Sequence, residues 1–400
     1  MSLPPPPNPY GGQPPYGGQP PQGGQPPYGG QPQWGGPQPG AGEGQFSGPP
    51  PWGPPPQQPP WGGPPMGPPP HKGGKGKWVL GGVIVLLVVA LAVTVTILVT
   101  RDGSDGNSPT PPGDGQASEF ASANDTGPVN IITEDPTCDA WGKVAREYVD
   151  ETKAVGWDKR DPLLPSTAWT PDQRAMYEAV GEAMSRAAGQ TVKLAKNTPH
   201  RAMRELYQQF VAYSNQFVAT IPDYRSEDRQ LAFTTDAIVT ATANICSSID
   251  YESAPAIAPL VVTPSTPTTI APLGDPADPA IFIEQDNPAC QKWSDMVNRF
   301  GDETADWVAI DPAIPAAEWT PEQRDINEKA ARAMVANADE VEKLGRESGN
   351  PTLEDIATLG AQYRRGFAEA IPDYNANDNF LAQAATYLVR IIDSGCKALQ

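Results

Sequence analysis

From residue 138 onward, hydrophobic residues recur at alternating intervals of three and four positions. The clearest run contains Met203, Leu206, Phe210, Tyr213 and Phe217, which this spacing places on one face of an α-helix. No stretch of this region shows the sustained alternation of apolar and polar residues that predicts a β-strand. The pattern therefore predicts an all-α fold for the C-terminal part of the chain.

Four amphipathic helices are predicted between residues 136 and 252, and the same order returns in residues 287–400. In the first region the second helix starts at Pro171, the third contains Phe210 and the fourth contains Ile238. Four such helices bury their apolar faces by packing as an up-and-down bundle. We therefore predict two tandem four-helix bundles.

The two predicted bundles are copies of one sequence. The segment "DPLLPSTAWTPDQR" (161–174) matches "DPAIPAAEWTPEQR" (311–324), and Cys246 matches Cys396 at the same offset. Between the copies lies a segment rich in Pro, Thr and Ala (253–286), which we expect to be an extended linker of a composition typical of O-glycosylated segments. The duplication thus predicts one domain present twice.

The repeated hexapeptides "WTPDQR" and "WTPEQR" have the features of a helix start. Thr170 stands at the N-cap, Pro171 at the first helical position and Gln173 three residues past the cap, and the second copy repeats this order. This structural interpretation explains most of the motif, while a binding role for the remaining residues stays open.

The N-terminal part differs sharply in composition. It holds more than half of the chain's 50 prolines and repeats units such as "GGQPPY". A segment so poor in apolar residues cannot offset the entropy cost of ordering, so we expect a disordered tail with polyproline II stretches. Its regularly spaced Tyr and Trp residues fit either docking of a cytoplasmic partner or a solvated spacer.

Residues 78–100 carry no charge and, as a helix, would measure about 34 Å, enough to cross a bilayer. Lys72, Lys75 and Lys77 precede this segment, whereas Arg101 and then several aspartates follow it. The positive-inside rule places the N-terminus in the cytoplasm and the two bundles outside. The predicted organisation is a tail (1–77), a transmembrane helix (78–100), an acidic flexible linker (101–135), a first bundle (136–252), a linker (253–286) and a second bundle (287–400).

The net charge of the chain is −19, and the tail has more lysines than acidic residues. All of the negative excess therefore lies beyond the predicted transmembrane helix. Phosphate binding requires clustered Lys and Arg, so this balance argues against nucleic acid as a partner.

The four cysteines stand at the two ends of each copy. In an up-and-down bundle the start of the first helix and the end of the fourth lie at the same end. We therefore predict disulfides Cys138–Cys246 and Cys290–Cys396, which an exported location permits. A zinc site is the alternative, but the CxxC and paired-His spacings that it requires are absent from the sequence.

The sequence contains no recognisable catalytic constellation. It has only two histidines, His71 and His200, and lacks the G-x-S-x-G, P-loop and G-x-G-x-x-G motifs. We therefore expect no catalytic residue, no metal site and no cofactor. A pair of carboxylates working as in a glycosidase stays open, because sequence alone cannot place two such groups at a working distance.

The connection between the first two helices of each copy is unusually long for a bundle and has a Trp at each end. It is either a lid that packs its tryptophans over the open end of the bundle, or an aromatic-lined groove for a peptide, glycan or lipid. The candidate groove residues are Trp157, Asp161, Trp169, Arg174 and Asp223 in the first copy, and Trp307, Asp311, Trp319, Arg324 and Asp373 in the second.

The "GGQPPY"-like tail, the lysine-flanked apolar segment and the acidic helical part with paired cysteines resemble the proline-rich single-pass membrane proteins of mycobacterial and nocardial actinobacteria. This resemblance covers the layout of the whole chain. It implies a location in the plasma membrane and provides neither an activity nor functional residues.

These observations favour a membrane-anchored cell-envelope protein whose duplicated outer domains bind or sense a partner. That partner would be an envelope protein, a glycan or a lipid. Two alternatives stay open at this point: a carboxylate-dependent hydrolase of an envelope polymer, and a passive structural spacer.

Overall fold

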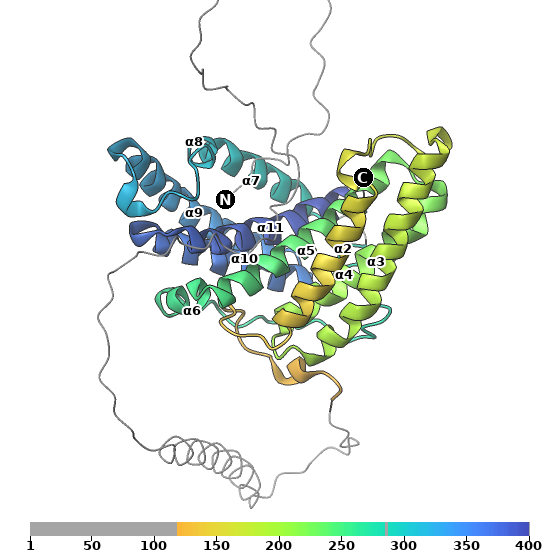
Figure 1. Ribbon diagram of the computed structural model, residues 1–400. Helices are drawn as coiled ribbons and strands as arrows, with labels where there is room; N and C mark the ends of the chain where they lie inside the picture. The colour runs from red at the N-terminus through yellow and green to blue at the C-terminus, as the bar shows by residue number, and fades with distance from the viewer. Residues whose placement is uncertain (1–117, 285–286, 400) are drawn as a thin grey trace, which may run out of the picture. The chain divides into compact units, whose positions relative to one another are not determined.

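The computed structural model describes residues 118–284 and 287–399, and within these residues it contains helices and no β-strand (Figure 1). The predicted all-α fold is thereby confirmed for this part of the chain. The α-helices of the first copy are α2 (Cys138–Ala154), α3 (Pro171–Asn197), α4 (Arg201–Thr220) and α5 (Arg229–Asp250), followed by the short α6 (Ser253–Ile257). Those of the second copy are α7 (Ala289–Glu303), α8 (Ala305–Val308), α9 (Pro321–Glu347), α10 (Pro351–Ala370) and α11 (Asn379–Lys397).

Short 3-10 helices fill the connections. They are η1 (Ala121–Asn124), η2 (Trp157–Lys159), η3 (Ser166–Ala168), η4 (Ile221–Asp223), η5 (Ser226–Asp228), η6 (Ala258–Leu260), η7 (Ala316–Glu318), η8 (Ile371–Asp373) and η9 (Ala376–Asp378). In each copy, 3-10 turns lie in the same two places: in the long connection after the first helix, and between the last two helices. The copies therefore share their connections as well as their helices.

Each copy places its four long helices next to one another in a closed cycle. In the first copy α2 packs on α3, α3 on α4, α4 on α5 and α5 back on α2, and the second copy repeats this with α7, α9, α10 and α11. Both predicted disulfides are present, Cys138–Cys246 and Cys290–Cys396, and each joins the first helix of a copy to the last. Their pairing follows from the up-and-down order of the helices.

The two copies pack directly against each other through α5 and α11, which lie side by side in the middle of the protein (Figure 1). Both helices have buried residues around most of their circumference. Across this contact the Thr234 hydroxyl donates a hydrogen bond of 2.9 Å to the hydroxyl of Ser394. The buried side chains of the two copies consequently form one continuous hydrophobic core.

The segment that precedes each copy packs on the opposite copy. Ahead of the first copy, Ile131 and Ile132 lie against α10: the Tyr363 hydroxyl donates to the Ile132 carbonyl at 3.3 Å, and Ile131 packs over Gly366. A side chain at Gly366 would overlap Ile131, because a Cβ added there would come within 2.8 Å of its terminal methyl group. The segment before the first bundle thus helps to complete the second.

The equivalent segment ahead of the second copy packs on α4. The Phe282 ring lies 5.9 Å from the ring of Tyr213, and the Phe282 amide donates to the Gln209 side chain at 2.9 Å. Tyr213 corresponds by its place in the repeat to Tyr363, and the contacting residues Phe282 and Ile132 lie eight and six residues ahead of the first cysteine of their copies. The exchange is therefore reciprocal, as in a two-fold dimer whose halves swap arms.

The expected linker 253–286 takes part in this packing. It begins with α6, which packs on α10, and its later residues run along α4, as the contacts of Phe282 show. Between α6 and α7 the described residues after η6 have no helix, in agreement with an extended segment. The segment between the two expected bundles consequently packs on both copies in addition to connecting them.

The predicted tail and transmembrane segment (residues 1–77 and 78–100) lie outside the described residues. Among the residues that the structure does describe, none of the helices combines the length and the apolar composition needed to cross a bilayer.

Candidate functional site

The repeated hexapeptide forms the start of α3 and of α9. The Thr170 hydroxyl accepts from the Gln173 amide at 3.2 Å, and the Gln173 side chain accepts from the Thr170 amide at 2.9 Å. The second copy contains the same capping box, between Thr320 and Gln323. The predicted helix start is confirmed in both copies.

Trp169 and Arg174, the first and last residues of the motif, fix the conformation of the preceding loop. The Trp169 indole N–H donates to the Leu164 carbonyl at 2.9 Å, and the Arg174 guanidinium donates to the Ser166 carbonyl at 3.0 Å. The Trp169 ring also stacks on Tyr177, with 3.9 Å between ring centroids. These contacts give both residues a structural role in the loop.

The second copy makes the equivalent bonds. Trp319 donates to the Ile314 carbonyl at 3.0 Å, and Arg324 donates to the Ala316 carbonyl at 3.0 Å. Its Trp319 ring stacks on Tyr374. Because every bond is reproduced despite differences in the loop sequence, the loop is one rigid unit that is present twice.

Asp161 and Asp311 form the turn at the start of this loop. Each carboxylate accepts a hydrogen bond of 2.9 Å from the amide two residues ahead, that of Leu163 or Ala313. This is the turn geometry that aspartate favours in loops. Both side chains are thus bound within their own turn, although Asp311 remains exposed.

The remaining groove candidates fall into two groups. Trp157 is buried against Tyr177, and Trp307 donates its indole N–H to the Asn327 side chain at 3.0 Å. Asp223 and Asp373, at the ends of η4 and η8, are exposed. The tryptophans of the loops therefore pack against neighbouring side chains of their own copy, and a lid or a binding role for the exposed aspartates stays a prediction.

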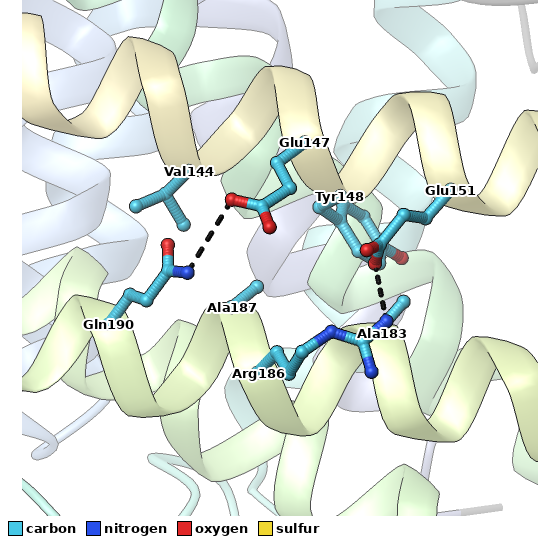
Figure 2. Close-up of a pocket in the computed structure, with 8 residues that line it drawn as sticks. All are labelled: Val144, Glu147, Tyr148, Glu151, Ala183, Arg186, Ala187 and Gln190. Carbon is cyan, nitrogen blue, oxygen red and sulfur yellow. Dashed lines mark hydrogen bonds and ion pairs between the residues drawn. The ribbon is translucent and has the colours of Figure 1, made fainter.

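A shallow groove runs between α2 and α3 of the first copy (Figure 2). Two polar pairs bridge it: the Gln190 amide donates to Glu147 at 3.5 Å, and Arg186 donates to Glu151 at 2.8 Å. Pockets that enclose small ligands measure about 300–1,000 Å³, whereas this groove encloses no such space.

The floor of the groove consists of Val144, Tyr148, Ala183 and Ala187. The Tyr148 hydroxyl donates to Asp236 on α5 at 3.0 Å, which fixes the ring in place. Burial, together with the neighbouring Asp236 carboxylate, raises the pKa of Tyr148 well above its ordinary value. Tyr148 therefore stays neutral and acts as a rigid part of the floor.

The second copy has different residues in these positions. Val144 is replaced by Met296 and Ala187 by Asn337, which are larger. The polar pair Glu147–Gln190 is replaced by Arg299 and Glu340, with a donor–acceptor distance of 2.7 Å. The copies therefore keep a common frame and differ on this outer face.

A buried cluster of charges lies where α4 of the first copy meets α10 of the second. The Arg201 guanidinium donates to both carboxylate oxygens of Asp355, at 2.6 and 3.2 Å, and both side chains are 1% exposed. Arg201 also binds the segment before the first copy, through the carbonyl oxygens of Asp125 and Gly127. One side chain thus connects the leading segment, α4 and α10.

Glu205 belongs to the same cluster and contacts Arg204 at 3.2 Å. Its pKa is raised well above the ordinary value by burial and by the nearby Asp355 carboxylate. The Glu205 Oε2 atom is buried and receives no hydrogen bond from a donor in the described part of the protein. A protonated Glu205 that donates to Asp355 satisfies both observations.

This cluster was not predicted from the sequence. The one feature that indicates it is a difference between the copies: "HRAMRE" (200–205) in the first copy corresponds to "NPTLED" (350–355) in the second. Arginines in one copy and acidic residues in the other mark a contact between unlike surfaces. Their proximity becomes evident only once α4 and α10 are packed together.

The residues that the structure describes contain no group of three or more His, Cys, Asp or Glu side chains placed to hold a metal ion. The carboxylates that do come together, Glu205 and Asp355, are sealed from solvent.

The chain is similar to proteins from mycobacteria. The chain is 43% identical over 334 residues to an uncharacterized protein of Mycolicibacterium smegmatis strain MKD8, covering 82% of this chain and 88% of the relative. No solved structure matches the chain. The family model described as mycobacterial ESX-1 associated protein matches residues 120–400, the range that contains both copies. The chain belongs to this mycobacterial ESX-1 associated family.

Proposed function

We propose that this protein is a membrane-anchored cell-envelope protein whose two-copy helical body lies outside the cytoplasm and binds a partner in an ESX-1 secretion context. The description of its family supports the ESX-1 context. The uncharged segment 78–100, with lysines before it and aspartates after it, supports the anchor and its direction.

The two disulfides support an oxidising compartment. Cys138–Cys246 and Cys290–Cys396 account for all four cysteines of the chain. Disulfides of this kind persist outside the cytoplasm and are rare inside it. This argument supports an outer location of both copies, as does the charge pattern around residues 78–100.

The observation that carries the binding role is the fusion of two similar copies into one body. The exchanged leading segments and the α5–α11 contact hold the outer faces of the copies in a fixed relation. A rigid surface loses little conformational entropy on binding, which favours affinity for a partner. The difference between the groove of Figure 2 and its counterpart in the second copy provides two unlike faces for that partner.

The hydrolase alternative finds no supporting geometry among the described residues. A glycosidase requires two carboxylates on either side of a substrate in an accessible cleft. Glu205 and Asp355 face each other, but they are 2% and 1% exposed. Asp161 and Asp311 are each bound within a turn of a different copy.

The proposal is tested by site-specific photocrosslinking in living cells. A crosslinking amino acid is placed at exposed, matched positions of the two copies: residues 186 and 336 on the outer helices, and residues 163 and 313 in the loops. We expect a discrete adduct from at least one pair, which disappears in cells whose ESX-1 system is disabled. The absence of any ESX-1-dependent adduct from all four positions would refute the binding role.

The location is tested separately with alkaline phosphatase, which is active only outside the cytoplasm. A fusion after residue 400 is expected to be active and a fusion before residue 2 inactive. The reverse result would overturn the proposed topology, whatever the crosslinking shows.

A further inference from the structure

The segment that joins the copies lies on the protein surface with a repeat of three residues. Val261, Pro264, Pro267 and Ile270 are half-buried, whereas the two residues between each of them are exposed. Three residues per turn is the repeat of the polyproline II helix, which proline favours. We call residues 261–270 the strap.

Side chains of the helices donate hydrogen bonds to backbone carbonyls of the strap and of the residues that follow it. Gln362 donates to the Val262 carbonyl at 3.3 Å, and Arg346 donates to the Ser265 carbonyl at 2.8 Å. Further on, Gln208 donates to the Leu273 carbonyl at 2.6 Å. The strap is consequently fixed with its proline side toward the protein.

Five of the six outward positions of the strap carry hydroxyl groups, and the sixth is the exposed Val262. Thr263, Ser265, Thr266, Thr268 and Thr269 are all exposed, and none of these hydroxyls takes part in a hydrogen bond within the described residues. Elsewhere in the protein, Thr and Ser hydroxyls commonly bond to the helix backbone, as Thr191 and Thr235 do. The strap therefore presents a row of free hydroxyls to solvent on an extended backbone.

We propose that these five strap residues are sites of O-glycosylation, with the sugar attached to the outward hydroxyls. Serine and threonine interspersed with proline form the composition of O-glycosylated segments. The structure adds the condition that composition alone cannot supply, because the acceptor oxygens point away from the protein while the prolines do not. A sugar attached at any of them would displace no packed side chain.

The group transferred is a glycosyl unit from an activated donor in which the anomeric carbon is joined to a phosphate. The hydroxyl oxygen of the strap residue forms a bond to the anomeric carbon, and the bond from that carbon to the phosphate oxygen breaks. The phosphate leaves with the electron pair, and the hydroxyl proton passes to a base of the transferase or to water. No oxidant or reductant is needed.

A docked proline-recognition module is a poorer fit to the strap. Such modules bind the prolines of a polyproline II helix in aromatic-lined grooves. Pro264 and Pro267 are half-buried, and the carbonyls of Val262 and Ser265 already accept hydrogen bonds from the body. Apart from Val262, the free outward face is made of small polar residues.

The experiment is mass spectrometry of the full chain purified from the membranes of its native host. We expect a peptide covering the strap to carry mass increments of whole sugar residues. The variant with alanine at positions 263, 265, 266, 268 and 269 should lose these increments and keep its fold. The matched control, Thr126→Ala, removes another exposed hydroxyl and should leave the increments unchanged.

An unmodified strap in the native protein would overturn the inference, and so would increments of phosphate in place of sugar. The inference rests on the proposed outer location, because the donor and transferase must meet the strap there. An unmodified strap together with an active phosphatase fusion at residue 400 would refute the glycosylation alone. An inactive fusion together with an unmodified strap would refute both.

Discussion

Glu205 and Asp355 hold equivalent positions in the two copies, and their carboxyl groups interact inside the protein where α4 meets α10. Two like charges at such a contact would repel each other. Arg201 offsets this by binding Asp355 through two hydrogen bonds, while burial and the neighbouring carboxylate raise the pKa of Glu205 well above its ordinary value and so favour its neutral form. The contact between the copies therefore depends on the charges of these three residues.

This contact predicts a dependence of stability on pH. The raised pKa of Glu205 means that its contribution to folding is fully present below the pKa of the unfolded chain and is lost as pH rises through the folded-state pKa. In Glu205→Gln, the amide keeps a donor and does not titrate. We expect the wild-type protein to lose stability relative to this variant on raising the pH, with a slope of up to about 1.4 kcal/mol per pH unit.

Thermal unfolding of the two full chains between pH 5 and pH 9 provides the measurement. The quantity to compare is the difference between their free energies of unfolding at each pH. A difference that stays constant over the whole range would show that Glu205 is as ionised in the folded protein as in the unfolded chain, and would contradict its raised pKa.

Removal of the buried Arg201 guanidinium should lower the free energy of unfolding far more than removal of a surface cation. Arg201→Met leaves Asp355 buried without its partner, and loss of one partner of a buried ion pair costs about 3–5 kcal/mol. Arg186→Met removes the exposed pair with Glu151 and should have no measurable effect. Denaturant unfolding followed by tryptophan fluorescence distinguishes the two, and equal effects would contradict a special role for Arg201.

The exchanged segments are tested at Gly366, where Ile131 and Ile257 each come within 2.8 Å of the position of an added Cβ. The first copy has Gln216 at this place, and it is exposed. We expect Gly366→Gln to destabilise the protein by about 1–3 kcal/mol through overpacking, even though glycine is a poor helix former. Hydrogen exchange should increase in residues 129–133 in particular.

The control for this experiment is Gln216→Ala, which alters the equivalent position where no segment packs. It should change the free energy of unfolding by no more than a few tenths of a kcal/mol, and it should leave hydrogen exchange in the segment before the second copy unchanged. Equal exchange in residues 129–133 of wild type and Gly366→Gln would mean that the segment does not dock on α10.

The shared core predicts a single unfolding transition. Two independent bundles would unfold in two steps, whereas copies that complete each other's cores should unfold together. Replacement of Cys290 and Cys396 by alanine should lower the stability of both copies at once, by about 2–5 kcal/mol. Calorimetry of the full chain checks this, and a variant in which only the second copy melts early would contradict it.

Local features of the fold were accessible from the sequence. The capping boxes at Thr170 and Thr320, the repeated helices and both disulfides depend on short-range patterns or on the order of helices. The contact between α5 and α11 is indicated less clearly by the sequence. The stretch 230–249 has one charge, Asp236, which is typical of a helix buried on several sides.

The long-range contacts could not be predicted in the same way. Ile131 and Phe282 belong to segments whose sequences are typical of linkers, and their composition does not indicate that they pack on the opposite copy. The pairing of Arg201 with Asp355 joins residues from different copies, and no sequence pattern indicates which helix faces which. The expected groove at the Trp-framed loops was a reasonable hypothesis, but the polar atoms of Trp169 and Arg174 are used within the loop itself.

The packing of the two copies also determines when the protein can finish folding during its synthesis. Residue 282, which completes the first copy, is made before the second copy, but α11, which packs on α5, is made last. Until then, α5 lacks the helix that covers it in the finished protein. A newly made first copy must therefore wait in a partly packed form, and its maturation ends only with the arrival of the second.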